Sequence, residues 1–265
     1  MSLAAYVDGI GVLGPGLNGW PETAAILSGR RAYCAAPTVL PTPSMLPPAE
    51  RRRTGRVVKV ALGVALEATA AAAADTMLLP SVFSSSGSDG HICHEICQAL
   101  SLPAREVSPT RFSNSVHNAP AGYWSIATGA MAESNVLCAF DASFTAGLLD
   151  AMTQVNVDQR AILLVAYDTE YPPPLHAKRP IPDAFGIAMV LAPRLTAQSL
   201  ARLEVALTDE AFATMREPQL ESLRASIPAA RGLPLLETLA LQEKGRTIIE
   251  YLDIARAGVQ IEPCR

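Results

Sequence analysis

The stretch from Asn135 to Val155 constrains the fold more than any other part of the chain, because a short apolar run changes there into a helical pattern. The run Asn135–Phe140, NVLCAF, has the length and character of a buried strand. Large apolar residues then recur at every fourth position, with small residues between them: Phe144, Leu148 and Met152. This spacing predicts a helix packed closely on a sheet. Asp141 stands at the junction, where enzymes often hold a nucleophile, and we expect it to cap the helix.

Composition narrows the class of protein. The 265 residues suffice to bury a full core, and 49% of them are hydrophobic while only 17% are charged. A net charge of −4 gives no electrostatic support to a nucleic-acid partner. No apolar run reaches the roughly 18 residues of a membrane span, and the N-terminus does not read as a signal peptide. Five cysteines without regular spacing favour a cytoplasmic protein over a disulfide framework.

Strand and helix patterns alternate along the chain, which predicts an α/β fold with a mixed, mostly covered sheet and a buried helix layer. The expected strands are Ala4–Leu13, Leu79–Phe83, Asn135–Phe140, Arg160–Ala166, Phe185–Leu191 and Ala201–Leu207. The expected helices are Trp20–Leu27, Thr54–Asp75, one ending near Leu100, one starting near Asn118, and the one after Asp141. Glycines at positions 9 and 11 interrupt the first strand, so we expect another backbone to approach it closely there.

The last part of the chain reads differently from the first. Residues 1–207 carry the alternating α/β pattern, whereas residues 208–265 contain two helical stretches and a probable hairpin packed on the same domain. The helices are expected at Pro218–Ser226 and Leu233–Leu241, and the hairpin strands at Thr247–Leu252 and Gly258–Glu262.

Four segments, in this order, carry a resemblance to a known family. They are VDGIGVLGPGLNGWPETAAILSG from Val7, SPTRFSNSVHNAPAGYWSI from Ser108, the stretch 135–155, and FGIAMVL from Phe185. Residues 1–207 resemble the N-terminal half of the β-ketoacyl synthases, which have a thiolase-like fold. The resemblance implies a thiolase-like half, truncated relative to a full ketosynthase. The segment SVHNAPAGYWSI is most similar to truncated, ketosynthase-like proteins called chain length factors, of the aryl polyene type.

Two departures from the family pattern bear on activity. Phe140-Asp141-Ala142-Ser143 stands where the family has its nucleophilic cysteine, and the family's two catalytic histidines belong to a second half that these residues do not include. A carboxylate is a weaker nucleophile than a thiolate, and its acylation would give an anhydride that water destroys. It would also repel a malonyl carboxylate. We therefore expect Asp141 to fill a dead site, with His117 and Cys138 as weaker catalytic candidates and no cofactor.

The resemblance also implies a partner. In ketosynthase dimers the segment matching 108–118 reaches the acyl tunnel of the other subunit, and strands near the nucleophile strand pair across the two-fold axis. Carried over to this sequence, the tunnel or interface residues would be Thr110, Arg111, Phe112, Ser115, Val116, His117, Asn118, Phe140 and Ser143. The leading hypothesis is a non-catalytic subunit of a heterodimer with an active ketosynthase, which meets acyl carrier protein through that complex and sets chain length in fatty acid, polyketide or aryl polyene type biosynthesis. The alternatives are a stand-alone acyl-thioester enzyme and a homodimeric protein that binds acyl chains.

Four other patterns have simpler interpretations. Cys93 and Cys97 are one helical turn apart near two histidines, but no second pair of ligands appears, so we expect no metal and read the cysteines as part of the helix's apolar face. Cys138 is expected to be a small buried residue within its strand. The loop Ser84–Gly90 lacks the lysine and spacing of a phosphate-binding loop, and Arg51–Arg53 reads as a solvated helix end rather than a docking site for an acidic carrier protein.

Overall fold

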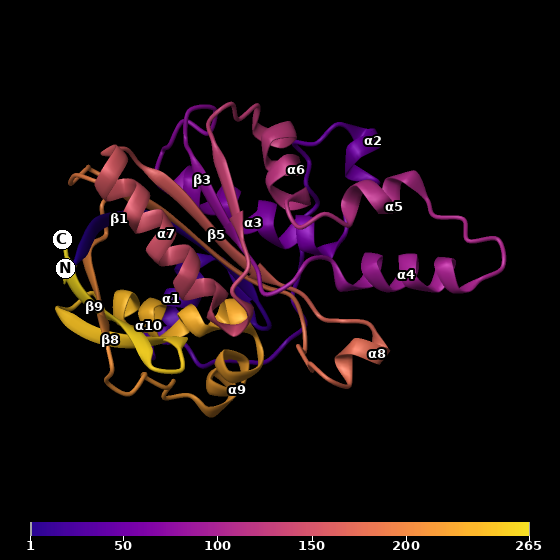
Figure 1. Ribbon diagram of the computed structural model, residues 1–265. Helices are drawn as coiled ribbons and strands as arrows, with labels where there is room; N and C mark the ends of the chain where they lie inside the picture. Colours follow the sequence, from indigo (N-terminus) through magenta and orange to yellow (C-terminus); the bar gives the residue numbers. More distant parts are fainter. Residues whose placement is uncertain (1, 265) are drawn as a thin grey trace.

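A single nine-stranded mixed sheet organises the computed structural model, which describes residues 2–264. The strand order is β4-β3-β5-β6-β1-β7-β9-β8, with the short β2 paired to β1 (Figure 1). β3 pairs in parallel with β4 and β5, and the other pairs are antiparallel. The α/β fold with a mixed sheet, expected from the alternating pattern, is therefore confirmed.

The elements have the following bounds. The strands are β1 Leu3–Gly14, β2 Leu17–Asn18, β3 Ser81–Ser84, β4 Ser134–Leu137, β5 Ile162–Asp168, β6 Phe185–Ala192, β7 Ala201–Thr208, β8 Gly245–Leu252 and β9 Ala255–Pro263. The α-helices are α1 Trp20–Leu27, α2 Pro48–Arg51, α3 Arg56–Ala71, α4 Gly90–Ser101, α5 Pro109–Asn114, α6 Ala119–Thr128, α7 Ser143–Asp158, α8 Pro173–His176, α9 Pro218–Ser226 and α10 Leu233–Leu241. Two 3₁₀ turns, η1 Phe140–Ala142 and η2 Pro228–Gly232, complete the set.

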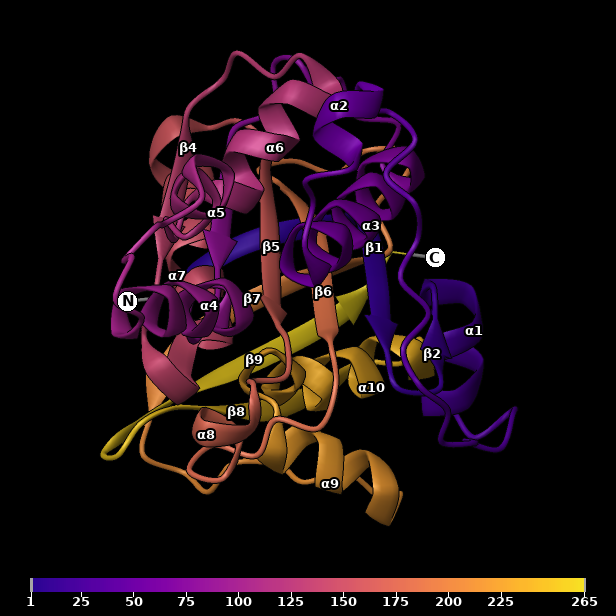
Figure 2. The same ribbon diagram turned by 90° about the vertical axis from the view of Figure 1, so that its right-hand side faces the viewer.

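Helices cover both faces of the sheet, and each face has its own apolar core. On one face α7 packs with η2 and α10 around buried residues such as Phe144 and Leu236. On the other face α3 and α6 pack around Phe83 and Trp124 (Figure 2). β5 and β6 lie between these layers and are buried along their whole length, which is why their sequences are almost uninterrupted apolar runs.

The two glycines of β1 let α3 lie directly against the strand. A Cβ atom at Gly9 would stand 2.1 Å from the carbonyl oxygen of Ala68, and one at Gly11 would stand 2.1 Å from that of Val64. Any side chain there would therefore collide with the helix backbone. The close backbone approach predicted from these glycines is confirmed.

The C-terminal residues complete both the sheet and one core layer. β8 and β9 form the expected hairpin, and β9 joins it to β7. η2 and α10 place Ala229 and Leu233 in the same apolar cluster as Phe144 of α7. Residues from 208 onward thus cover the α7 side of the sheet and extend the sheet at one edge.

An exposed arm, residues 90–118, projects from the body of the protein and contains α4 and α5 (Figure 1). Gly90 is the only buried residue of α4, and α5 has none. The expected apolar face of α4 therefore does not face the core, and Cys93 and Cys97 are exposed. α5 was not predicted from the sequence, because its residues are typical of turns.

The helices are short relative to a bilayer. Within residues 2–264, none is long and apolar enough to cross a membrane.

Candidate functional site

The junction between β4 and α7 is a tight turn that its own residues hold in shape. β4 ends at Leu137, and the 3₁₀ turn η1 covers Phe140–Ala142 before α7 begins. The Ser143 hydroxyl accepts a hydrogen bond from the Ala139 amide at 3.0 Å and donates one to the Phe140 carbonyl at 2.7 Å. Phe140 has a φ of +52°, in the left-handed region that favours glycine, so the turn carries backbone strain just before Asp141.

Two arginines hold Asp141. Arg179 Nη2 lies 2.5 Å from one carboxylate oxygen, and Arg231 Nη2 lies 3.0 Å from the other. The Arg179 guanidinium also stacks on the Phe140 ring, with its carbon 3.8 Å from the ring centre. The predicted capping role of Asp141 is wrong, because Ala142 is the residue before α7 and no side chain caps the helix there. The carboxylate turns away from the helix end and towards these cations.

The pair of arginines belongs to a longer chain of charges. Arg231 Nε lies 3.5 Å from Glu250 of β8, and Glu250 accepts a hydrogen bond from Arg224 at 2.5 Å. Arg224 is buried and forms two more hydrogen bonds to Glu221, which raise the pKa of the Arg224 guanidinium. The network therefore ties the β4–α7 junction to α9 and to the C-terminal hairpin.

A second aspartate, Asp168, lies at the end of β5 and is fully buried. Its carboxylate accepts hydrogen bonds from the Ser86 amide at 2.9 Å, the Ser86 hydroxyl at 2.6 Å and the Ala229 amide at 2.8 Å. Burial raises the pKa of Asp168 to about 6, although these donors act in the opposite direction. Asp168 thus joins the loop after β3 to η2, and no pattern in the sequence indicates this role.

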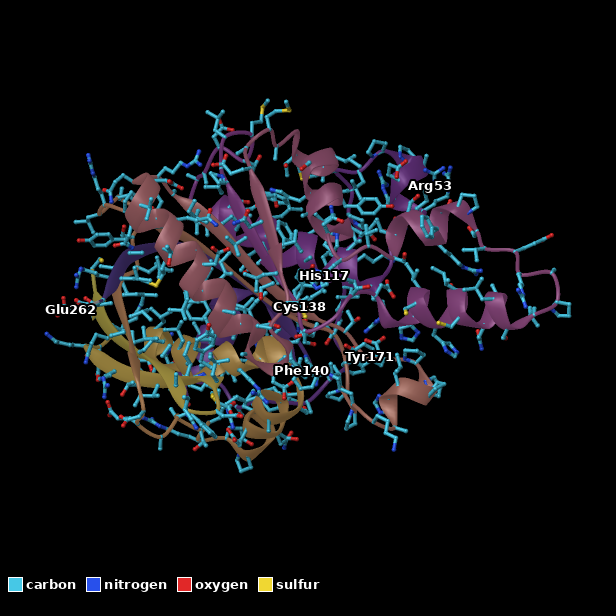
Figure 3. All side chains as sticks on the ribbon, viewed as in Figure 1. Arg53, His117, Cys138, Phe140, Tyr171 and Glu262 are labelled. Carbon is cyan, nitrogen blue, oxygen red and sulfur yellow. The ribbon has the colours of Figure 1, made fainter. Side chains whose placement is uncertain are left out.

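The two weaker catalytic candidates lie on either side of the same short loop (Figure 3). His117 interacts with the Ser85 backbone, and burial lowers the pKa of its imidazole. Its Nε2 atom is buried and has no hydrogen-bond partner among the described residues. The Cys138 thiol donates to the Ser86 carbonyl at 3.2 Å. The prediction of a buried Cys138 within its strand is wrong, because β4 ends one residue earlier and Cys138 is exposed.

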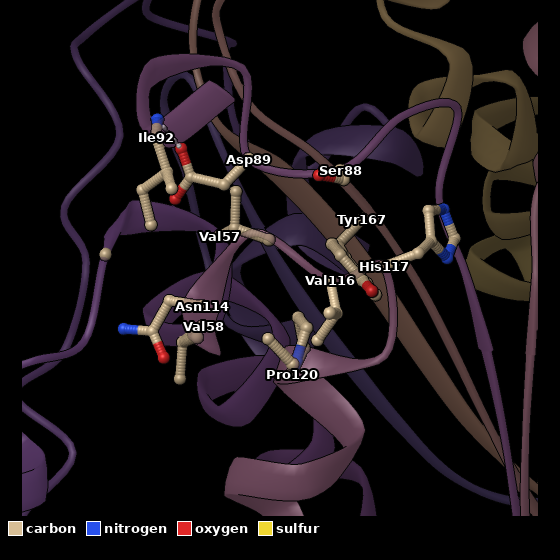
Figure 4. A pocket seen from close by; sticks show the side chains of 12 residues that line it. Val57, Val58, Ser88, Asp89, Ile92, Asn114, Val116, His117, Pro120 and Tyr167 are labelled. Carbon is tan, nitrogen blue, oxygen red and sulfur yellow. Dashed lines mark hydrogen bonds between the residues drawn. The ribbon is translucent and has the colours of Figure 1, made fainter. Parts of the chain in front are cut away.

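A small cavity lies where the arm meets α3 and α6 (Figure 4). Its lining includes Val58, Asn114, Val116, His117 and Tyr167, and its volume is about 10 Å³. That volume matches roughly one water molecule, so the cavity cannot hold an acyl chain.

Most of the predicted tunnel and interface residues lie at the surface of the arm or the junction. Phe112 is 67% exposed and Val116 48% exposed, and Phe140 is also exposed. Arg111 and Asn118 are exposed, while Thr110, Ser115 and His117 are half-buried. Arg111 forms an ion pair with Glu95 of α4 at 2.7 Å, which braces the arm. Ser143 is buried, so it shapes the turn from within and has no surface to offer a partner.

The serines and arginines singled out in the sequence form contacts within the chain. Among residues 2–264, no group of three or more His, Cys, Asp or Glu side chains is placed to hold a metal ion. The Ser84–Gly90 loop uses its hydroxyls internally, as in the bond from Ser84 to the Ser143 carbonyl. Arg51 donates to the Leu46 carbonyl at 3.0 Å and Arg53 pairs with Glu50 at 3.0 Å, so both stabilise the local helix end.

One protein family matches most of the chain. Residues 27–247 match the model of the beta-ketoacyl synthase N-terminal domain. The chain belongs to the beta-ketoacyl synthase N-terminal domain family. In members of this family that condense acyl chains a cysteine would occupy the junction where this domain carries Asp141, as the resemblance of the sequence implies. No curated protein sequence matches the chain.

Solved structures show the same fold. A ketosynthase in complex with its chain length factor from Xenorhabdus doucetiae contains a chain with a TM-score of 0.74 and 21% identity, and the match covers 97% of this domain and 99% of that chain. The ishigamide ketosynthase/chain length factor gives 0.72 and 13%, covering 98% and 99%. A type II polyketide ketosynthase complex with its acyl-carrier protein, AntDE:AntF, gives 0.75 and 12%, covering 99% and 100%. The expected thiolase-like half-fold is therefore confirmed.

The arginines around Asp141 are the residues that the sequence did not reveal. Arg179 lies in a proline-rich loop and Arg231 in η2, and neither has a spacing that relates it to Asp141. The available signal was indirect: a partly buried aspartate that does not cap a helix requires a cation.

Proposed function

We propose that this chain is a non-catalytic, chain-length-factor-like subunit that pairs with an active ketosynthase and shapes its acyl tunnel. The biosynthetic setting would be of the fatty acid, polyketide or aryl polyene type. The observation that carries the proposal is the state of Asp141, whose two carboxylate oxygens are both engaged by arginines at the place of the family's nucleophile.

The chemistry of Asp141 argues against condensation. A nucleophile must present a lone pair to the thioester carbonyl, but the Asp141 oxygens point to Arg179 and Arg231. Arg179 and Arg231 occupy both carboxylate oxygens with hydrogen bonds, which leaves Asp141 poorly placed to attack a carbonyl group. Asp141 thus lies in an ion-pair network at the junction between β4 and α7.

The surface around the arm supports a partner. Leu100, Leu102, Phe112 and Val116 are exposed apolar side chains of residues 90–118. β4, an edge strand in the body of the protein, pairs only with β3 and leaves its other side unpaired within the described residues. Unprotected strand edges and clustered apolar side chains are typical of protein interfaces. Similar chains occur in ketosynthase/chain length factor complexes.

The interior of the chain also supports a shared tunnel. The cavity beside Val116 and His117 has room for about one water molecule, and the arm stands away from the body of the protein. An acyl chain that meets this region would therefore lie between two subunits, with Phe112 as the bulkiest exposed group. Bulk at the floor of a tunnel rejects the next two-carbon unit by steric clash.

Co-expression with an active ketosynthase of the same organism tests the proposal. We expect a stable heteromer, and we expect Phe112→Ala to lengthen the product by one or more two-carbon units. Leu195→Ala is the matched control, because Leu195 is an exposed apolar residue outside the arm. Absence of a heteromer, together with a product length that ignores Phe112→Ala, would refute the subunit role.

A second assay distinguishes the proposed subunit from a stand-alone acyl-thioester enzyme. The purified chain alone is incubated with acyl- and malonyl-carrier protein, and covalent acylation is followed by intact-protein mass spectrometry. We expect neither turnover nor an acyl adduct. Turnover that disappears in Asp141→Ala, or an adduct on Cys138, would favour the enzyme instead.

A further inference from the structure

A trough of about 430 Å³ opens beside Asp141. One wall is the loop after α8, with Lys178 and Arg179, and the other is α9, with Ser222 and Ser226. η2 contributes Arg231. The trough is thus built from the junction, the loop before β6 and the C-terminal part of the chain.

The charge of the trough is unbalanced. Three cationic side chains line it, those of Lys178, Arg179 and Arg231, against the single carboxylate of Asp141. Glu250 contacts Arg231 from outside the trough, but Arg224 also binds Glu250. The Lys178 ammonium has no partner among residues 2–264, and each arginine uses only Nη2 on Asp141, which leaves its Nη1 group uncommitted.

An apolar hollow of about 400 Å³ adjoins the trough at Ser222, which lines both. Its walls include Pro15, Tyr33, Pro182 and Leu223. The Tyr33 hydroxyl is committed to the Pro15 carbonyl at 2.9 Å, so the ring presents mainly its apolar surface there. A cationic site and an apolar surface therefore lie end to end along α9.

We propose that this surface binds a phosphate monoester with a short apolar chain. The phosphate would lie among Lys178, Arg179 and Arg231, because the uncommitted Nη1 group of each guanidinium can donate a charge-assisted hydrogen bond to a phosphate oxygen and the free ammonium adds a point charge. The apolar chain would lie along the hollow beside Leu223 and Tyr33. This site does not depend on the partner subunit proposed above.

The charge of Asp141 allows a test in which a substitution should increase the affinity for phosphate. Its carboxylate repels a dianion and also occupies one nitrogen of each guanidinium. Removing the charge should therefore strengthen binding, whereas removing any of the three cations should weaken it. A surface that merely attracts anions through the net field of the protein would not respond so locally, since the chain as a whole carries a charge of −4.

The experiment is a calorimetric titration of the full purified chain with hexyl phosphate. We expect saturable binding that Lys178→Ala weakens about threefold to tenfold and Asp141→Asn strengthens by a similar factor. Lys178→Ala should not disturb folding, since the side chain has no partner among residues 2–264. Lys244→Ala is the matched control, with the same loss of charge on the C-terminal hairpin, and should leave the affinity unchanged.

Chain length and head group define the ligand class. Methyl phosphate should bind several-fold more weakly than hexyl phosphate, and hexanoate more weakly still. The proposal fails if hexyl phosphate does not bind at millimolar concentration, or if Lys178→Ala and Lys244→Ala have equal effects. Equal affinity for methyl and hexyl phosphate would overturn the part played by the apolar hollow, and tighter binding of hexanoate would overturn the phosphate class. None of these outcomes bears on whether a ketosynthase heteromer forms.

Discussion

The sheet and the arm place similar side chains in opposite environments. Phe144 of α7 is completely buried against η2 and β6, whereas Phe112 of α5 is mostly exposed on the arm. β5 and β6 bury every residue, while α4 buries only Gly90. The protein is apolar in both regions, but only in the sheet do these residues stabilise the isolated chain.

This contrast divides the apolar residues of the chain between two environments, the core and the exposed arm. A buried phenylalanine is explained by folding, whereas an exposed one on the arm agrees with the partner proposed above. The arm therefore contributes little to the stability of the chain, and its sequence is free to follow the requirements of an interface.

The sharpest test of the contrast compares the two phenylalanines. Phe144→Ala should lower the free energy of unfolding by about 3–5 kcal/mol, because it leaves a cavity in a closed core. Phe112→Ala should change it by less than about 0.5 kcal/mol, because an exposed side chain loses few contacts. Urea unfolding of the isolated variants measures both. Equal losses would show that the arm is folded onto the body in solution.

Asp168 lies where the sheet meets the arm, because its carboxylate binds Ser86 in the loop that leads from β3 into α4. The pH dependence of stability tests the contribution of this carboxylate. Its pKa is raised to about 6 in the folded protein from an ordinary value of 3.8, so the folded state disfavours the ionised form. The associated stability is present below about pH 4 and is lost as the pH rises through about 6, by about 3 kcal/mol at most.

Unfolding free energies measured from pH 4 to pH 7 for the wild type and Asp168→Asn check this prediction. The wild type should lose stability relative to the variant as the pH rises across that range. The variant also replaces one of the two carboxylate oxygens, both of which accept hydrogen bonds, by an amide NH2 group. Its absolute stability is therefore expected to be lower, and only the difference in slope reports the titration. Parallel curves would contradict a raised pKa.

Substitutions at two glycines should have smaller effects than Phe144→Ala. Gly9→Ala should destabilise the chain by about 1–3 kcal/mol, because its Cβ would collide with the backbone of α3. Gly122→Ala should stabilise it by about 0.5–1 kcal/mol, since Gly122 lies within α6 and has no atom near the added methyl group. Thermal unfolding of both variants separates them. A loss of stability in Gly122→Ala would mean that α6 is packed more tightly than the structure indicates.

Much of the fold could be predicted because its signals are local. Each of three local patterns predicts the surroundings of its own residues: the apolar runs of β5 and β6, the glycines of β1, and the apolar residue at every fourth position of α7. The hairpin of β8 and β9 was also recognisable, although its strands are longer than predicted. The apolar spacing of α4 predicted a face towards the core, but Gly90 is the buried residue of this helix, because apolar spacing alone does not distinguish a core face from an exposed one.

The candidate site was predictable only in part. The position of Asp141 between a strand and a helix followed from the sequence, and the structure places it there. Its partners come from positions 38 and 90 residues further along the chain, and no local pattern can announce such pairs. Cys138 was misplaced because the strand ends one residue before it, a difference that apolar character alone cannot resolve.

The order β7-β9-β8 has a consequence for the synthesis of the protein. β8 reaches the rest of the sheet only through β9, so the ribosome must release residues up to Pro263 before the open side of β7 can be covered. Until then the nascent chain exposes the backbone of β7 to any neighbouring polypeptide, and a translation stop within β9 would leave that template permanently open.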